Sequence, residues 1–108
     1  MVDLDPARGS EANKRRPAVI VSNDGANTTA VGLNRGVITV VPVTSNVSRV
    51  HPFQVLLPAT ECGLPSDSKA QAEQVRSVAI ERIGRRVGQL TAPLLAELDE
   101  ALRLHLAL

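Results

Sequence analysis

The sequence predicts a small α+β domain in which a curled antiparallel sheet, or open barrel, is closed by one C-terminal helix. Short runs rich in Val, Ile and Leu alternate with turn residues, which is typical of several short strands. A leucine-periodic segment follows at the C-terminal end. The length of 108 residues suits one compact unit, so we treat residues 1–108 as a single domain.

Three segments have the composition of strands. Residues 17–22, PAVIVS, form a β-branched run that predicts a strand buried on both faces, with a proline at its first position. Residues 37–44, VITVVPVT, predict a second strand, in which Pro42 indicates a bulge or an edge position. Residues 53–57, FQVLL, predict a third.

The rest of the chain divides into loops, an ambiguous segment and a helix. Residues 44–52 are a polar loop and residues 58–68 a turn-rich connection. Residues 69–79, KAQAEQVRSVA, contain the helix-favouring Ala, Gln and Glu, but their apolar residues are spaced loosely enough to allow a strand. From Thr91, a suitable N-cap, leucines recur at three- and four-residue spacing and predict an amphipathic helix.

Composition narrows the function classes. Hydrophobic residues make up 44% of the chain and charged residues 21%, with a net charge of +1, which is ordinary for a globular protein. No apolar run is long enough to span a bilayer, and the start MVDLDP does not have the form of a secretory signal. The single Cys62 fits a reducing compartment, so we expect a cytoplasmic protein that is not attached to a membrane.

Aromatic and metal-binding residues are scarce. The chain has one Phe and no Tyr or Trp, which excludes the common mode of RNA binding in which bases stack on several aromatic side chains of a sheet. Cys62, His51 and His105 form no metal-ligand pattern in the sequence. We therefore expect neither a metal ion nor another cofactor.

Three consecutive cations, Lys14, Arg15 and Arg16, stand directly before the first predicted strand. A charge run of this kind is commonly a solvated loop. Here, however, the strand would hold Arg16 on rigid backbone, and an anchored guanidinium is suited to binding phosphate. The sequence therefore suggests a phosphate site at the start of this strand.

Two further groups of polar residues are candidates. Thr44, Ser45 and Asn46 end the second strand, where they either cap their own backbone in a turn or form a pocket of neutral donors; the sequence leaves their distance to Arg16 open. Arg49 and His51 follow in the same loop, and His51 is able to exchange protons near neutral pH. A third mixed group comprises Glu73, Gln74 and Arg76, and polar residues of this kind are normally solvent-exposed without a specific role.

Taken in order, the segments VDLDPARGSE, RRPAVIVSND, VITVVPVTSN, FQVLLPA, GLPSDSKAQAEQVRSV and RVGQL resemble the MazF/PemK family of toxin endoribonucleases over nearly the whole chain. The resemblance implies an SH3-like antiparallel barrel related to the gyrase poison CcdB, and a homodimer. It also implies metal-free cleavage of single-stranded RNA at short sequences, leaving 2′,3′-cyclic phosphate and 5′-hydroxyl ends. The implied partner is a MazE-like antitoxin whose disordered tail occupies the RNA groove.

By position, the resemblance makes Arg16 and Thr44 the catalytic residues. Glu11 is our first choice for the group that accepts the 2′-hydroxyl proton, with Glu73 and His51 as alternatives. We expect the RNA to be contacted by the other polar residues named above and by the serine before Glu11: Ser10, Lys14, Arg15, Ser45, Asn46, Arg49, His51, Glu73, Gln74 and Arg76.

Two departures from the family pattern qualify the resemblance. The histidine, arginine and aspartate of the PemK and Kid branch would fall at Ser10, Gln71 and Glu73, so this chain belongs with the arginine-threonine members. Relatives usually carry a short R-G-E-[IV]-W segment before VDLDP, and its lack here predicts a truncated first strand or a start inside the natural one. Alternatives to a ribonuclease are a CcdB-like toxin that only binds protein, and a degenerate toxin that only binds antitoxin.

Overall fold

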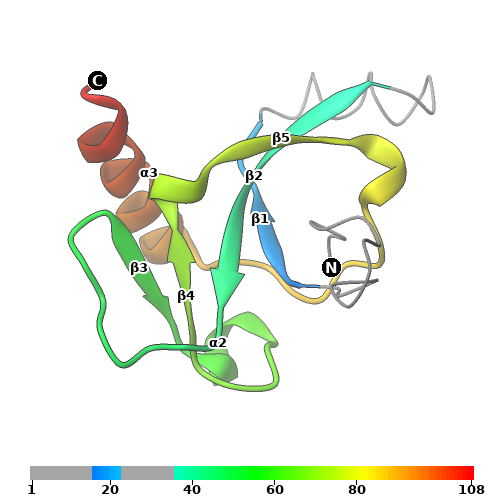
Figure 1. Ribbon diagram of the computed structural model, residues 1–108. Helices are drawn as coiled ribbons and strands as arrows, with labels where there is room; N and C mark the ends of the chain where they lie inside the picture. The colour runs from blue at the N-terminus through cyan, green and yellow to red at the C-terminus, as the bar shows by residue number, and fades with distance from the viewer. Residues whose placement is uncertain (1–15, 23–35) are drawn as a thin grey trace.

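The structure, a computed structural model, describes residues 16–22 and 36–108 (Figure 1). Predictions for the other residues, including the truncated first strand, lie outside this part. The described strands form a five-stranded sheet, namely β1 (Ala18–Ile20), β2 (Val37–Thr44), β3 (Gln54–Leu57), β4 (Ser68–Gln71) and β5 (Arg76–Ala79). The helical elements are α2 (Ala59–Cys62), η2 (Ala72–Gln74), η3 (Ile80–Arg82) and α3 (Ala92–Leu106).

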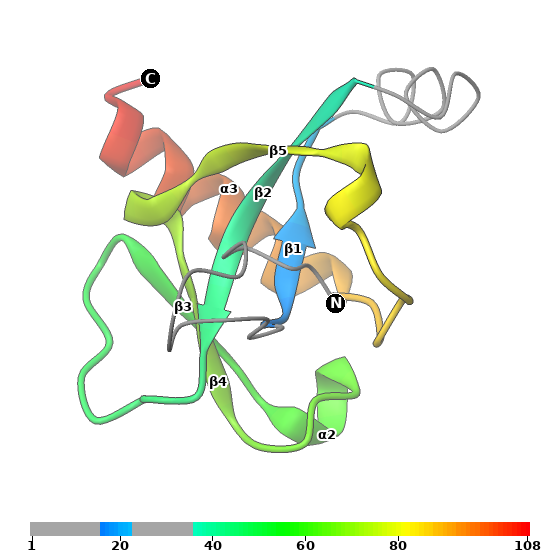
Figure 2. The same ribbon diagram turned by 45° about the vertical axis from the view of Figure 1, so that its right-hand side comes forward.

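The long strand β2 organises the sheet, and every pairing is antiparallel. β1 pairs with one side of β2, whereas β4 and β5 pair with the C-terminal and N-terminal halves of its other side. β3 lies outside β4, which gives the order β1-β2-β4-β3. In Figures 1 and 2, α3 lies behind this sheet, so the predicted α+β class with a C-terminal helix is confirmed.

The core explains why the sheet curls. Side chains alternate between the two faces of a strand. In the first half of β2, Ile38 and Val40 pack with Val78 in one buried cluster, whereas Val41 and Val43 in the second half belong to another. Since β2 buries opposite faces in its two halves, the sheet must curve around two small cores.

α3 covers the face of the sheet to which Val41 and Val43 point. The predicted N-cap is confirmed, because Thr91 Oγ1 accepts a hydrogen bond from the Leu94 amide at 3.4 Å. Leu94, Leu98 and Ala101 are buried in the cluster that contains Val43. We call the opposite side of the sheet, to which Thr44 points, the front face.

The prediction for residues 17–22 was wrong in extent and burial. β1 has three residues, and its Ile20 side chain is 43% exposed. In the described part of the chain β1 pairs with β2 alone, which makes it an edge strand. A β-branched run shows that a segment favours the extended conformation, but it does not show whether neighbours cover both faces.

Pro42 lies neither at a bulge nor at an edge, contrary to the sequence prediction. Toward β1 it faces Ala18 in an unbroken register. On its other side it falls where the partner of β2 changes, because the pairing with β5 ends at Val40 and the pairing with β4 begins at Val43. The missing N–H of proline therefore costs no ladder hydrogen bond.

The later segments contain elements that the sequence did not resolve. The turn-rich connection includes the short helix α2, which begins after Pro58 and ends at Gly63. The ambiguous segment 69–79 is divided by η2 into β4 and β5. The Ala72 amide donates to the Phe53 carbonyl at 3.2 Å, a contact with another strand that local propensity cannot reveal. Across the described residues, no helix has the length and apolar character needed to cross a membrane.

Candidate functional site

The strand register brings the two predicted catalytic residues face to face. Ala18 pairs with Pro42 and Val19 with Val41. The Val43 amide also donates to the Pro17 carbonyl at 3.1 Å, so the ladder extends toward Arg16. Continuing this register places Arg16 opposite Thr44, on the same face of the sheet. Side chains in such a pair have Cβ atoms about 4.5–5.5 Å apart.

A hollow of about 420 Å³ opens beside this pair. Its walls include Arg16, Thr44 and Ser45, which the sequence singled out, and Ser66 and Ser68, which it did not. Ser68 is buried and its hydroxyl donates to the Ser66 carbonyl at 3.0 Å, so Ser68 shapes the wall. The hollow thus combines one guanidinium with several hydroxyl groups, a lining suited to a phosphate.

Thr44 takes part in a turn and keeps a donor for a ligand. Its Oγ1 accepts a hydrogen bond from the Asn46 amide at 3.3 Å. Asn46 Oδ1 in turn accepts bonds from the backbone amide and the hydroxyl of Ser48, at 3.3 and 2.9 Å. The predicted turn chemistry is therefore confirmed. Because the Thr44 oxygen is an acceptor in this bond, its hydroxyl proton is available to donate to a ligand.

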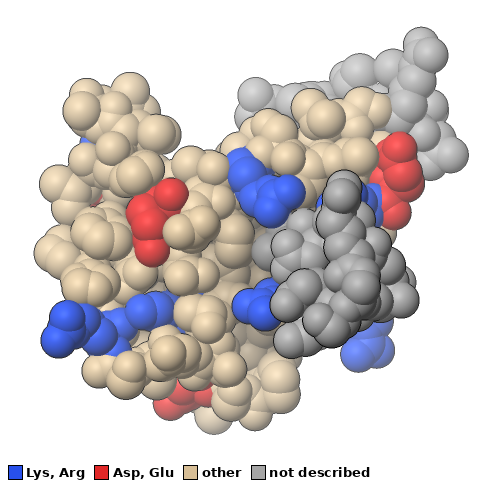
Figure 3. Space-filling model, in the orientation of Figure 1, with Lys and Arg blue, Asp and Glu red and all other residues tan. Residues whose placement is uncertain are grey.

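The same face carries further positive charge. Lys69 on β4 is opposite Thr44 in the register, and Arg76 on β5 is opposite Val40, so both extend to the front face. Arg76 and the neighbouring Gln74 are exposed. Figure 3 views the molecule with α3 behind, and Lys and Arg side chains lie in several groups across it, with separate Asp and Glu side chains.

The loop between β2 and β3 contains the predicted recognition residues. The Arg49 side chain is exposed, and its backbone carbonyl accepts a hydrogen bond from Lys69 Nζ at 2.6 Å. The His51 ring stacks on Phe53 with centroids 5.3 Å apart. This stack orients the imidazole, whereas Arg49 is available to a ligand.

Glu73 makes a contact away from the Arg16–Thr44 pair. Its Oε2 accepts a hydrogen bond from Gln54 Nε2 at 2.8 Å, and its Oε1 is buried. Gln54 Oε1 accepts from the His51 amide at 3.0 Å. Gln54 and Lys69 were missed by the sequence analysis. Gln54 is a polar residue between the apolar Phe53 and Val55, which is a signal that identifies it.

Four of the predicted site residues precede the part of the chain that the structure describes. Ser10, Glu11, Lys14 and Arg15 lie outside the described residues, so their roles stay predictions. Of the predicted site, the hollow brings together Arg16, Thr44 and Ser45, whereas Arg76 lies further along β2, opposite Val40. Asn46, Arg49 and His51 lie on the loop that leaves the hollow.

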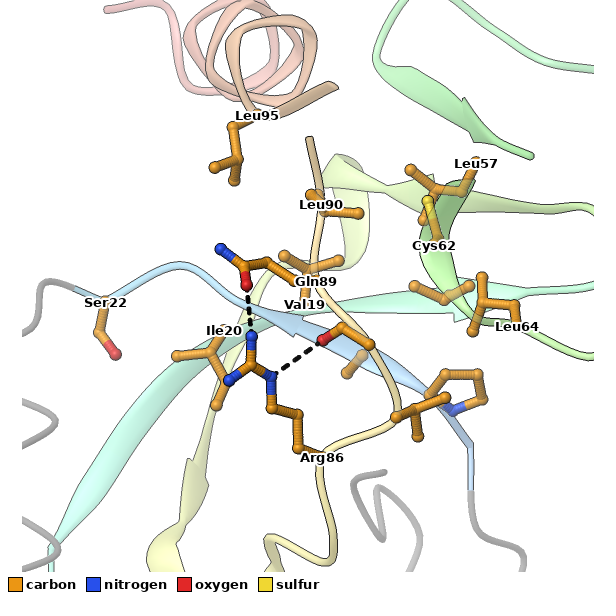
Figure 4. Close-up of a pocket in the computed structure, with 15 residues that line it drawn as sticks. Val19, Ile20, Ser22, Leu57, Cys62, Leu64, Arg86, Gln89, Leu90 and Leu95 are labelled. Carbon is orange, nitrogen blue, oxygen red and sulfur yellow. Dashed lines mark hydrogen bonds between the residues drawn. The ribbon is translucent and has the colours of Figure 1, made fainter. Parts of the chain in front are cut away.

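A second cavity of about 430 Å³ lies between β1, α2, the segment 86–90 and the start of α3 (Figure 4). Its lining is largely apolar and includes Val19, Leu57 and Cys62. Arg86 stands at its rim, where the guanidinium donates to Gln89 Oε1 and to the Gly88 carbonyl. A cavity with apolar walls cannot stabilise a phosphate as the hollow at Thr44 can.

Cys62 in this cavity should react slowly with thiol reagents. Burial, and then the negative charge of Glu61, raise the pKa of its thiol, so less reactive thiolate is present. We expect iodoacetamide to modify the folded protein about tenfold or more slowly than the unfolded chain. Equal rates would contradict this.

The raised pKa of the Cys62 thiol also makes the stability of the fold depend on pH. Because the pKa is higher in the folded state, the thiol's contribution to the free energy of unfolding is complete at neutral pH and is lost as pH rises past its ordinary pKa of 9.0. The urea midpoints of unfolding at pH 7 and pH 10 measure this loss of stability. Cys62→Ala is the control, because it has no thiol and should lack the thiol's share of the pH dependence.

Comparisons with known proteins agree with the fold and the residue pattern. The chain matches the family described as PemK-like, MazF-like toxin of type II toxin-antitoxin system over residues 1–106. Endoribonuclease MazF9 of Mycobacterium tuberculosis is 69% identical over 107 residues, which cover 99% of this chain and 91% of that protein.

Solved structures give the same result. MazF from Deinococcus radiodurans is 28% identical with a TM-score of 0.75, covering 99% of this chain and 90% of that chain. A MazE-MazF structure from the same organism is 30% identical with a TM-score of 0.70, covering 86% of each chain. The chain therefore belongs to the PemK/MazF family of toxin endoribonucleases of type II toxin-antitoxin systems.

Proposed function

We propose that this toxin cuts single-stranded RNA at short sequences without a metal ion, by attack of a ribose 2′-hydroxyl on the adjacent phosphorus. The P–O5′ bond breaks as the new P–O2′ bond forms. The 2′-hydroxyl gives up its proton and the departing O5′ takes one up, which leaves a 2′,3′-cyclic phosphate and a 5′-hydroxyl end. The observation that carries the proposal is the pairing of Arg16 with Thr44 beside a hollow lined by hydroxyl groups.

Arg16 and Thr44 would stabilise charge in this reaction. The phosphorane formed by the attack carries two negative charges, and a guanidinium that is charged at every physiological pH offsets them. The Thr44 hydroxyl donates to a non-bridging phosphate oxygen, because its own oxygen already accepts from Asn46. The sheet holds the backbone of both residues, because Thr44 ends β2 and Arg16 is bridged to the sheet just before β1.

The proton acceptor in our proposal is Glu11, chosen from the family resemblance. Glu73 suits this task less well, because its Oε2 is bonded to Gln54 beyond the end of β4. His51 is stacked on Phe53, on the loop that leads away from Thr44. An arginine guanidinium is in general a poor proton acceptor, so we do not propose Arg16 for this task.

We propose that the partners of the toxin bind at its front face. RNA would lie over the front face along the positive charge of Arg16 and Arg76, with base contacts from Arg49 and His51. A MazE-like antitoxin would silence the toxin by covering this groove. We also propose a cytoplasmic homodimer, to which the exposed Leu95, Leu104 and Leu106 of α3 would contribute apolar surface.

Replacing Thr44 by valine tests the role of its hydroxyl. Valine keeps the shape of the side chain and removes the donor, so we expect kcat on a cleavable RNA oligonucleotide to fall about a hundredfold, which corresponds to roughly 3 kcal/mol. Thr44→Ser keeps the hydroxyl and should remain within about fivefold of the wild type. Steady-state cleavage over a range of RNA concentrations gives kcat and KM for both variants.

The outcome separates chemistry from binding. A fall in kcat with an unchanged KM supports a donor that acts in the transition state. If Thr44→Val cleaves at the wild-type rate while remaining folded, Thr44 has no catalytic role and the proposed site is incorrect.

A further inference from the structure

Lys69 is an unusual residue for its position. It lies in β4 between Thr44 on β2 and Leu56 on β3, with only 9% of its surface exposed. Removing an ammonium group from water has a large desolvation cost, and lysines are rarely buried for that reason. A leucine or methionine would fill this position without that cost, so the lysine calls for an explanation.

The hydrogen bond of Lys69 supplies one. Its Nζ donates to the backbone carbonyl of Arg49 at 2.6 Å, twenty residues away in the sequence. The ammonium thus ties the β2–β3 loop to the sheet beside Thr44. A backbone carbonyl fixes the course of the loop without occupying the Arg49 side chain, which stays exposed.

A second buried polar residue holds the same loop two residues further on. Gln54 is 8% exposed, and its Oε1 accepts from the His51 amide at 3.0 Å while its Nε2 donates to Glu73 Oε2 at 2.8 Å. Its own backbone amide donates to the His51 carbonyl at 2.8 Å. Glu73 therefore fixes the amide group of Gln54, and Gln54 fixes the backbone at His51.

We propose that Lys69 and the Gln54–Glu73 pair are positioning residues that set which RNA sequences are cut, by holding residues 49–51 of the β2–β3 loop at a fixed place beside the catalytic pair. This inference rests on the proposed ribonuclease function. The ligand is a single-stranded RNA whose bases, next to the scissile phosphate, meet the side chains of Arg49 and His51. Neither tether touches the reacting atoms, so both act through the loop.

The test compares cleavage profiles of variants on a pool of RNA oligonucleotides with randomised bases around the cut. Lys69→Met keeps the aliphatic stem and removes the donor to Arg49. We expect preference for the best sequence over sequences with one base changed to fall about tenfold, the discrimination that one hydrogen-bonded base contact provides. KM on the best sequence should rise, while kcat stays within about threefold because Arg16 and Thr44 are unchanged.

Matched variants separate positioning from charge and from folding. Arg103→Met removes a cation whose side chain is exposed on α3, and it should leave the cleavage profile unchanged. Glu73→Leu removes the acceptor that holds Gln54 and should relax the profile in the same direction as Lys69→Met. Amide hydrogen exchange over residues 46–51 should accelerate in Lys69→Met and Glu73→Leu and stay at the wild-type rate in Arg103→Met.

Three results would overturn the inference. They are an unchanged profile with unchanged exchange in Lys69→Met, a collapse of kcat with an unchanged profile in Lys69→Met, and a Glu73→Leu variant that keeps the wild-type profile and exchange rates. If Lys69→Met does not fold, the profile and exchange rates of Glu73→Leu decide. If the wild type cuts no RNA, the proposed function fails as well; if it cuts and the variants keep its profile, only this inference fails.

Discussion

Replacing Arg16 by alanine is expected to reduce kcat for RNA cleavage by about a hundred- to a thousandfold, the loss typical of removing one preorganised group that stabilises transition-state charge. The side chain is exposed just before β1, so its truncation leaves no cavity in the core. The fold and the thermal midpoint should therefore stay close to those of the wild type, as circular dichroism would show.

Arg16→Lys distinguishes charge from geometry. Lysine keeps the positive charge but loses the planar fork of donors, so we expect an activity between those of the wild type and Arg16→Ala. Cells expressing Arg16→Ala should grow normally. If growth inhibition persists in a variant that cuts no RNA, the toxin acts by binding a protein and the catalytic account is wrong.

Replacing Gly88 by alanine should cause the largest loss of stability. A Cβ at this position would lie 2.0 Å from the Cys62 carbonyl oxygen and 3.0 Å from the Cys62 carbonyl carbon. Both are backbone atoms at the end of α2, next to the cavity of Figure 4, and neither can rotate away. We expect a destabilisation of about 3 kcal/mol, which corresponds to a fall of roughly 10–20 °C in Tm for a domain of this size.

Gly63→Ala provides a graded comparison for this prediction. Gly63 ends α2 with φ of 72°, where a side chain is disfavoured, and its Cβ would lie 3.0 Å from the Val87 carbonyl oxygen. We expect a loss of about 1–2 kcal/mol, smaller than at Gly88. Equal thermal midpoints for Gly88→Ala and the wild type would show that residues 87–88 do not pack against α2 in solution.

The parts of the fold that were predictable have strong local patterns. The bounds of β2 match the predicted 37–44, because a long β-branched run flanked by polar residues has few alternatives. α3 begins at its predicted N-cap, Thr91, because a capping residue followed by leucines at three- and four-residue spacing is an equally strong local pattern. β1 and η2 were not predictable. The burial of β1 depends on which neighbours it has, and η2 depends on the bond from the Ala72 amide to Phe53.

The candidate site, like the fold, was predictable from the sequence only in part. Arg16 and Thr44 are recognisable in the sequence from their places at strand ends, but their pairing requires a register between segments that are far apart in the chain. Lys69 was overlooked because it opens a segment of ambiguous propensity and because lysines are normally exposed. Its role becomes visible only when the Arg49 carbonyl lies against it.

The central claim is that the paired Arg16 and Thr44 cut RNA through its own 2′-hydroxyl. The most direct measurement incubates purified protein with a long single-stranded RNA in EDTA and determines the chemistry and position of the new ends, with Arg16→Ala alongside. The account predicts discrete cuts with 5′-hydroxyl and 2′,3′-cyclic phosphate ends that are absent in the variant. Ends carrying a 5′-phosphate, a requirement for a divalent metal ion, or cuts that persist in Arg16→Ala would contradict it.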